Sequence, residues 1–563
     1  MSVADVREWL AVLVNSRAAS KLSRGAYLVL GSALGMWGAW RATVGSLTFA
    51  YRQIGAYDEG VLLTDAHLVL WGKLPYLDFY TNYPPGIFLL LAGAFKLLGV
   101  SVGVERALGL ALHLAVGAAA GKLAGRLLGQ RFSWISAALV LTWIEPVGMI
   151  AYTWFAGLAL ALLACDLWGW ARERQRPAAY AVAGATLGLL SWFRHDLFIY
   201  FTLALGALGC VWIGLALRRG DRAPLGQALW TAAGALGMAC LMWVPVFALA
   251  GFRQVAADLY FDQVRYTMPA RVLPLPSLFE RAHVDWSPVP LPAFLREPFE
   301  SAVFLTFAAP VFALAALLLP RAAGLKPRGE VFWLAALSLA VWPQMLGRTD
   351  FWHAIFTVAP AVIWIWVWFR GGPARAWTWK AWPWAAAGLL LLYVPRQFNL
   401  PDTLWPPPYR PGPQPEPASH LSRAGNTFVD DTRQQVLAFV KENTEAGAPI
   451  YVGLSDHQWT HSNDMDLYFL TDRVGATRYM QFDPNLTNRE DVQERMIADL
   501  ERTRPQVAIL STAPQRRDEP NESQNAGATL LDDYFFSHYD QERSAGHFVL
   551  ALRKPDLALP GAQ

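Results

Sequence analysis

Hydrophobic residues recur along the first 395 positions in long runs that are separated by short polar segments. A helix needs about 20 apolar residues to cross the ~30 Å hydrocarbon core of a bilayer. The pattern therefore predicts a multi-pass α-helical membrane protein with about eleven spans, at 25–47, 104–125, 132–150, 152–170, 178–193, 197–217, 227–250, 301–320, 331–346, 354–369 and 381–395.

The segments between the runs alternate in charge. Basic residues gather before the first run, at 122–131, and in "RERQR", "RRGDR", "RAAGLKPRGE" and "RGGPARAWTWK", whereas the intervening loops hold fewer bases or more acids. The positive-inside rule places the basic segments in the cytoplasm. The N-terminus is then predicted to be cytoplasmic and the chain after residue 395 to lie outside. The first run is interpreted as an uncleaved span.

One apolar run, 84–99, does not fit this alternation. It is short for a span, and counting it as one would reverse the side of the basic turn at 122–131. It is therefore predicted to lie on or dip into the outer leaflet. The segment 48–103 becomes one external loop built of interfacial helices.

After residue 395 the pattern changes from membrane-like to soluble. The segment 396–424 contains "PPPYRPGPQPEP" and is predicted to be a proline-rich linker. Residues 425–563 predict a small extracytoplasmic α/β domain. Its expected helices are "TRQQVLAFVKENT" and "REDVQERMIADLERTRP", and its expected strands are "APIYVGL", "QVAIL" and a final strand in "SAGHFVLALRK".

Composition agrees with this division and narrows the classes of function. The chain is 54% hydrophobic and 16% charged, below the quarter that is typical of soluble domains. A net charge of +3 gives no reason to expect a nucleic-acid partner. The three cysteines lie in apolar runs without a C-x-x-C pair, so neither a zinc site nor a disulfide framework is indicated.

The external loop contains an acidic and aromatic stretch, "AYDEGVLLTDAHLVLWGKLPYLDFYTNYPPG" at 56–86. Carboxylates next to a bilayer are costly and are often functional, which draws attention to Asp58 and Glu59. The alternative is that one of the two caps the helix expected to follow. The residues alone leave both interpretations open.

This stretch resembles the first external loop of GT-C glycosyltransferases, in the bacterial branch that includes protein O-mannosyltransferases and aminoarabinose transferases. The resemblance rests on Asp58-Glu59 after the first span, the helix "GVLLTDAHLVLWGK", the aromatic "LPYLDFYTNY", the pair Pro84-Pro85, and Arg106. It covers the membrane part and, more loosely, the C-terminal domain. One departure is that Asn82-Tyr83 precedes the prolines where relatives often place a lysine.

The resemblance implies an inverting hexosyl- or pentosyltransferase that uses a sugar linked to polyprenyl phosphate. The acceptor, a glycan, lipid or protein, would be met on the outer face of a bacterial inner membrane. Asp58 is then the expected general base, because one carboxylate that takes the proton of the attacking hydroxyl gives direct displacement. Glu59 is a supporting acid, and Asp78, Tyr83 and Glu145 are expected to contact sugar or acceptor. Glu145 is otherwise a solvated loop acid.

A divalent metal is left open by the resemblance. Hard cations take carboxylate oxygens, so Asp58 and Glu145 are the candidate ligands.

A donor phosphate needs cations, and two clusters at outer helix ends supply candidates. "GRTDFWH" contains Arg348 and His353, with Asp350 expected to orient one of them, and "FRHD" contains Arg194. The alternative for "FRHD" is an Arg–Asp pair that stabilises a turn. The loop 251–300 mixes aromatic and charged residues in a way that suits a sugar or lipid-headgroup surface. It also suits interfacial anchoring, which is the favoured interpretation for each residue taken singly: Asp258, Tyr260, Asp262, Arg265, Tyr266, Arg271, His283 and Trp286.

The rival function is a polytopic lipid or glycan transporter with an external receptor domain. A transporter predicts paired halves with broken helices and charges at mid-membrane. The charges here gather at outer helix ends, which favours the enzyme.

Overall fold

The computed structural model of the chain describes residues 52–130, 133–272, 329–347, 353, 355–357, 359–364, 423–425, 427–514 and 523–555. Within this part of the chain, four helices are long and apolar enough to cross a membrane. The predicted spans at 25–47, 301–320 and 381–395 lie outside the described residues. The figure of eleven spans therefore stays a prediction.

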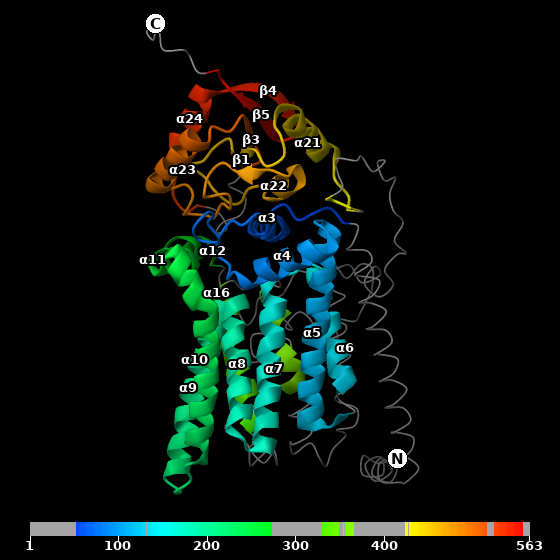
Figure 1. Cartoon of the computed structure of the whole chain (residues 1–563), viewed down its shortest axis with the longest axis vertical. Coiled ribbons are helices and arrows are strands. Elements are labelled where there is room, and N and C mark those ends of the chain that lie inside the picture. Colours follow the sequence, from blue (N-terminus) through cyan, green and yellow to red (C-terminus); the bar gives the residue numbers. More distant parts are fainter. Residues whose placement is uncertain are drawn as a thin grey trace, which may run out of the picture.

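The described helices of the membrane part form an antiparallel bundle (Figure 1). Its four long helices are α5 (Val102–Leu128), α7 (Thr153–Arg174), α9 (His195–Leu217) and α10 (Ala223–Ala250). The shorter ones are α6 (Ser133–Ile144), α8 (Pro177–Phe193), α15 (Gly329–Ala340) and α16 (Trp342–Gly347). Tryptophan and phenylalanine rings fill the core between α7, α9 and α15, where Trp168 stacks on Trp333.

Small residues allow the closest helix contact, between α8 and α10. A side-chain carbon added at Gly184 would lie 1.9 Å from the carbonyl oxygen of Thr231, and one at Gly234 would lie 2.0 Å from that of Ala181. Small residues at such positions are the usual way in which helices pack in a membrane. The outward faces of α9 and α10 expose large apolar side chains, among them Leu203 and Leu236, as a lipid-facing surface does.

Two helices, α3 (Asp58–Leu70) and α4 (Gly86–Leu98), lie between the bundle and the C-terminal region (Figure 1). The 13 residues of α4 span about 20 Å, too little to cross the hydrocarbon core. It buries Ile87, Phe88, Leu91 and Phe95 and exposes Leu97 and Leu98. This length is compatible with the prediction that 84–99 lies on or dips into the outer leaflet, which stays a prediction.

The C-terminal region is built on a five-stranded sheet in the order β2-β1-β3-β5-β4. Its strands are β1 (Pro449–Leu454), β2 (Val474–Gly475), β3 (Val507–Ser511), β4 (Tyr539–Ala545) and β5 (Phe548–Arg553). Strands β2, β1 and β3 run parallel, whereas β5 is antiparallel to β3 and to β4. Its helices are α21 (Asp431–Asn443), α22 (Asp466–Thr471), α23 (Glu490–Thr503) and α24 (Leu530–His538).

The sequence missed β4, because this edge strand carries no apolar alternation. Its five central residues, "DQERS", are all exposed. Charged side chains are common on edge strands, where they discourage pairing with other chains. The other expected elements of this region coincide with α21, α23, β1, β3 and β5.

The C-terminal region docks on α3 through main-chain contacts. The Asp466 N–H donates to the carbonyl oxygen of Ala56 at 3.1 Å, and the Thr64 hydroxyl donates to that of Met465 at 2.8 Å. Gly60 makes this approach possible, since a side-chain carbon there would lie 2.5 Å from the Asp466 nitrogen. Val61 and Leu68 of α3 join a core with Val436, Ile450 and other residues of the sheet and its helices. The start of α3 is therefore fixed from the C-terminal side.

A further helix follows α10 and contacts the C-terminal region; we call it the interfacial helix. It comprises α11 (Phe252–Ala256), the π-helical turns η3 (Ala257–Phe261) and η4 (Gln263–Thr267), and α12 (Met268–Arg271). π-helical turns are rare in proteins, and those that occur are often located at functional sites. This helix carries Arg271 to the region where α3 begins.

Candidate active site

Asp58 is the first residue of α3, and its side chain is exposed. Tyr57 occupies the N-cap position and makes no capping bond through its side chain. The N-cap position that the helix-capping alternative needs is thus held by Tyr57, although a carboxylate in the first turn still interacts favourably with the helix dipole.

Tyr152, just before α7, is a buried residue on which the charges of several candidate site residues act. Burial, followed by the charge of Asp58, raises the pKa of Tyr152 to about 12. A hydrogen bond with Tyr83 and the charges of Arg194 and Arg271 act in the opposite direction. The rings of Tyr83 and Tyr152 lie 6.4 Å apart, edge to face. One carboxylate and two guanidinium groups are therefore close enough to act electrostatically on Tyr152.

Glu59, predicted beside Asp58 as a second catalytic acid, points elsewhere. It is 1% exposed and accepts from Arg106 through both oxygens, at 2.7 and 3.1 Å. Its Oε2 also accepts the Gly55 N–H at 2.8 Å. Consecutive residues on a helix face directions about 100° apart. The acid pair is therefore divided: Asp58 lies on the exposed side of α3, and Glu59 ties α3 to α5.

Two other acids that were predicted to contact sugar or acceptor, Asp78 and Glu145, lie in a turn and at the start of a short helix. Asp78 is exposed and accepts the Leu74 N–H at 2.7 Å, which closes a turn. Glu145 begins the short 3-10 helix η2 (Glu145–Val147) at the end of α6. Among the residues that the structure describes, no group of three or more His, Cys, Asp or Glu side chains could hold a metal ion. A metal at Asp58 and Glu145 therefore gains no support from this part of the chain.

Arg194 lies at the junction of α8 and α9 and is held from two sides. Asp196 pairs with it in a bidentate manner, at 2.8 and 2.9 Å, and its guanidinium lies 4.4 Å from the ring centroid of Trp154. The predicted Arg–Asp pair is present. It coexists with the position of Arg194 near Tyr152, so the structural and the functional interpretation are compatible.

The second predicted phosphate cluster is partly described. Arg348 and Asp350 lie outside the described residues. His353 is half-buried, and Phe356, three residues later, stacks on Trp154 at 4.8 Å. Trp154 thus contacts both Arg194 and the segment that contains His353.

An apolar groove of about 510 Å³ lies among the helices of the bundle and α4, and Phe193 is one of its lining residues. It runs between α4, α5, α7 and α8, and is lined by Leu90, Leu112, Ala115, Ala118, Ala119, Lys122, Ala156, Ala159, Leu160, Leu163, Leu189 and Phe193. Phe193 is the neighbour of Arg194 in sequence, and Ala156 lies one helical turn after Tyr152. The groove has the volume of a small-molecule site and an apolar lining that suits a hydrocarbon chain.

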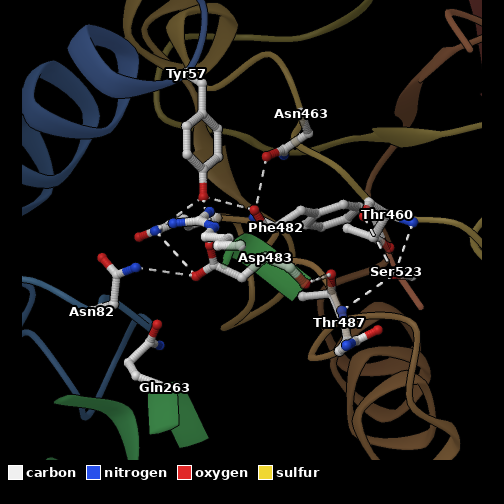
Figure 2. A network of polar contacts seen from close by, with 12 residues as sticks. Tyr57, Asn82, Gln263, Thr460, Asn463, Phe482, Asp483, Thr487 and Ser523 are labelled. Carbon is white, nitrogen blue, oxygen red and sulfur yellow. Dashed lines mark hydrogen bonds and ion pairs between the residues drawn. The ribbon is translucent and has the colours of Figure 1, made fainter. Parts of the chain in front are cut away.

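Arg271 and Asp483 are functional candidates that sequence reasoning did not select. Arg271 Nη2 donates to Asp483 Oδ1 at 2.6 Å, and Asp483 is fully buried while one third of the Arg271 side chain is exposed. Burial disfavours the charged form of Arg271, but Asp483, Tyr57, Tyr83 and Asp58 together raise its pKa. Figure 2 shows Tyr57 and Asn82 directed toward the Asp483 carboxylate.

The available sequence signal is the mixture of aromatic and charged residues in 251–300, which suits a sugar or lipid-headgroup surface as well as interfacial anchoring. This local pattern does not reveal the partner of Arg271. Asp483 lies 212 residues after Arg271, so no local pattern connects them.

Comparison of three-dimensional structures finds the same architecture in two membrane enzymes. ArnT, an aminoarabinose transferase from Cupriavidus metallidurans, bound to undecaprenyl phosphate, aligns with a TM-score of 0.54 and 12% identity over 96% of this chain and 99% of that one. The oligosaccharyltransferase of Archaeoglobus fulgidus, in complex with Zn and sulfate, aligns with a TM-score of 0.52 and 12% identity over 86% of this chain and 68% of that one. The apo state of the same ArnT aligns with a TM-score of 0.51 and 13% identity.

These similarities show the fold: the chain has the GT-C fold of membrane glycosyltransferases. No protein-family model matches the sequence, and no curated protein matches it in sequence.

Proposed function

We propose that the chain is an inverting GT-C glycosyltransferase, with a hexosyl or pentosyl donor on polyprenyl phosphate and an acceptor outside the cytoplasm. The observation that carries the proposal is that Asp58, Arg194 and Arg271 all act electrostatically on Tyr152, and that an apolar groove lined by Phe193 and Ala156 lies close by in the fold. A lipid-linked donor needs these three parts: a groove for the chain, cations for the phosphate and a carboxylate for the acceptor. That ArnT is bound to undecaprenyl phosphate in its structure supports this class of donor.

In the proposed reaction, the lipid chain occupies the groove and the phosphate contacts Arg194 and Arg271. Guanidinium groups suit phosphate oxygens because they donate two parallel hydrogen bonds. The acceptor oxygen attacks the anomeric carbon while the bond from that carbon to the phosphate oxygen breaks. Asp58 accepts the hydroxyl proton, and polyprenyl phosphate leaves with the bonding electrons. A single displacement inverts the configuration.

The remaining predicted residues take secondary places in the proposal. Arg348 and His353 are further phosphate contacts, with Asp350 as the residue that orients one of them. Glu145 and Tyr83 contact the sugar or acceptor. Asp78 closes a turn of the loop that carries Tyr83, and Glu59 fixes the position of α3.

The proposed setting is a bacterial inner membrane with a cytoplasmic N-terminus. We divide the chain into a catalytic membrane domain at 1–395, a linker at 396–424, and a periplasmic or extracellular α/β domain at 425–563. The α/β domain covers the site and contributes to it.

The decisive experiment uses the Asp58→Asn variant. Asparagine keeps the shape of the side chain but is not a base, so transfer should fall at least about 100-fold, the usual effect of a positioned general base. Cell-envelope glycans of a deletion strain would be compared by mass spectrometry with those of the strain carrying wild type or Asp58→Asn. The glycan missing from the deletion strain should return with wild type and stay missing with Asp58→Asn, at equal amounts of membrane protein.

Asp221→Asn is the matched control. This exposed aspartate at the other end of the bundle accepts the Ala223 N–H at 2.9 Å, and asparagine can accept the same bond. It should restore the glycan fully. If Asp58→Asn restores it as well, Asp58 is not the base. If deletion changes no glycan but alters the distribution of a lipid or polymer across the membrane, the transporter replaces the enzyme.

A further inference from the structure

We propose that Asp483, in the C-terminal α/β region, is a positioning residue that holds Arg271 in place for the donor phosphate. This inference rests on the proposed function, because it assigns the phosphate to Arg271. It makes the C-terminal region a part of the active site that the membrane part cannot replace.

The surroundings of Asp483 support this role. Its side chain is fully buried, and its Oδ1 lies 2.6 Å from Arg271 Nη2 and 3.0 Å from the Tyr57 hydroxyl. Its Oδ2 accepts from the Tyr80 hydroxyl at 3.0 Å and from Asn82 Nδ2 at 3.2 Å. A buried carboxylate needs this number of donors to offset the loss of hydration. Such a group stays in one position and so holds its partners in one position too.

The donors come from three places in the chain. Tyr57 precedes Asp58 directly, Tyr80 and Asn82 lie in the aromatic part of the same external loop, and Arg271 ends the interfacial helix. Gln263, also on that helix, donates to the Tyr80 hydroxyl at 2.6 Å. One carboxylate therefore fixes the guanidinium of Arg271 relative to Tyr57, the residue directly before the proposed base.

A positioned guanidinium binds phosphate better than a mobile one. A long side chain that becomes ordered on binding costs about 0.5–1.5 kcal/mol. Arg271 is already ordered by Asp483 on one side, while one third of its side chain is exposed and can meet a ligand. Loss of Asp483 should therefore weaken binding through Arg271.

The same interface offers a control that separates positioning from docking. Arg478 pairs with Asp258 on the interfacial helix and donates to the carbonyl oxygen of Tyr76 at 2.8 Å. Like Asp483, Asp258 is about 1% exposed or less and joins the same two parts of the molecule. Asp258 lies 13 residues before Arg271, more than three helical turns away. Asp258→Asn is thus the same chemical change in the same interface, away from the phosphate.

The test is a double-mutant cycle on the affinity for undecaprenyl phosphate, with thermal stability measured in parallel. Asp483→Asn should weaken binding about five- to tenfold in the wild-type background, and less than about twofold in the Arg271→Ala background. Asp258→Asn should lower the melting temperature to a similar degree yet leave the affinity close to that of wild type. This pattern would show that Asp483 acts through Arg271.

Other outcomes overturn the inference. Equal weakening by Asp483→Asn in both backgrounds, or by Asp483→Asn and Asp258→Asn alike, would reduce Asp483 to a docking residue. Unchanged or tighter binding by Asp483→Asn would mean that it does not position Arg271. If Arg271→Ala itself binds undecaprenyl phosphate like wild type, the assignment of the phosphate in the proposed function fails, which is a separate result. If Asp483→Asn does not fold, Asp483→Glu, which keeps the charge but displaces it by one methylene, takes its place in the cycle, with the same outcomes deciding.

Discussion

The two guanidinium groups near Tyr152 are held in different ways. Arg194 is paired with Asp196, two residues further on, and lies against Trp154 within the bundle. Arg271 is paired with Asp483, 212 residues further on, across the interface with the C-terminal region. The first position is set by local sequence and helix packing. The second exists once the C-terminal region has docked, so the position of Arg271 depends on contacts between distant parts of the chain.

The comparison predicts a difference between two alanine variants, and this is the largest effect expected from it. Arg271→Ala should raise the KM for a polyprenyl-phosphate sugar about 10- to 100-fold, because a charge-assisted hydrogen bond contributes about 1.5–3 kcal/mol. Arg194→Ala should raise KM as well and also lower the melting temperature, because it removes the partner of Asp196 and the contact with Trp154. Steady-state kinetics and thermal unfolding of both variants would measure the difference.

Arg253→Ala supplies the control, since Arg253 is an exposed arginine on the same interfacial helix as Arg271. It should keep both the KM and the melting temperature of wild type. Wild-type KM in Arg271→Ala would remove the second guanidinium from the comparison and return the phosphate to Arg194 and the Arg348 cluster.

A smaller effect on KM is expected from a substitution in the apolar groove that is proposed to hold the lipid chain of the donor. Ala159→Phe should fill part of the groove and exclude about two methylene groups of the lipid chain. At ~0.8 kcal/mol for each methylene, the KM for a long-chain donor should rise about tenfold. The KM for a donor with a chain too short to reach Ala159 should not change.

The comparison variant for the groove is Ala232→Phe, at an exposed position of α10. It adds the same bulk to a lipid-facing surface and should affect neither donor. If Ala159→Phe raises the KM of long and short donors equally, the groove does not hold the lipid chain.

The same contrast explains what the sequence could predict. Hydrophobic runs predicted α5, α7, α9 and α10, because burial in lipid needs length and apolarity, both of which are local properties. The hydrophobic pattern also shows that the run at 84–99 is short and that the charged cluster around Arg194 interrupts two apolar runs. The conflict between Arg126 and an extra span decided the interpretation of 84–99, and the structure shows a helix too short to cross.

What the sequence could not provide were the pairings between distant residues. Asp58 is predicted to be the base and Glu59 a supporting acid of the same site, yet Arg106 pairs with Glu59 and leaves Asp58 on the exposed side of α3. Arg271 was visible but could not be distinguished from an anchoring residue without Asp483. Both outcomes depend on which side of α3 meets which element, and that is decided by packing rather than by local pattern.

The smallest expected effect concerns the docking of the C-terminal region and leaves transfer at neutral pH unchanged. His67 of α3 is 2% exposed, and its Nδ1 lies 3.3 Å from Arg423 Nη1, where a neutral imidazole accepts the hydrogen bond. Burial, followed by the charge of Arg423, lowers the pKa of His67 to about 3. A histidine whose folded pKa lies below its unfolded value stabilises the fold fully above about pH 6.5. The stability is lost progressively as the pH falls from there toward 3. Between pH 7 and pH 5 the contribution of His67 to the free energy of unfolding should therefore fall by about 2 kcal/mol.

Buried acids act with the opposite sign in this range, since burial raises the pKa of Asp258 to about 6 and that of Asp466 to about 7. The measurement is thus the difference between wild type and His67→Gln, whose amide can accept from Arg423 but does not titrate. The variant should lose less stability than wild type on acidification, and this loss should weaken the Arg271 side of the site before the Arg194 side, which needs no docking. Parallel pH profiles for the two proteins would show that the pKa of His67 is the same in the folded and unfolded states, and that the docking of α3 does not depend on its neutral form.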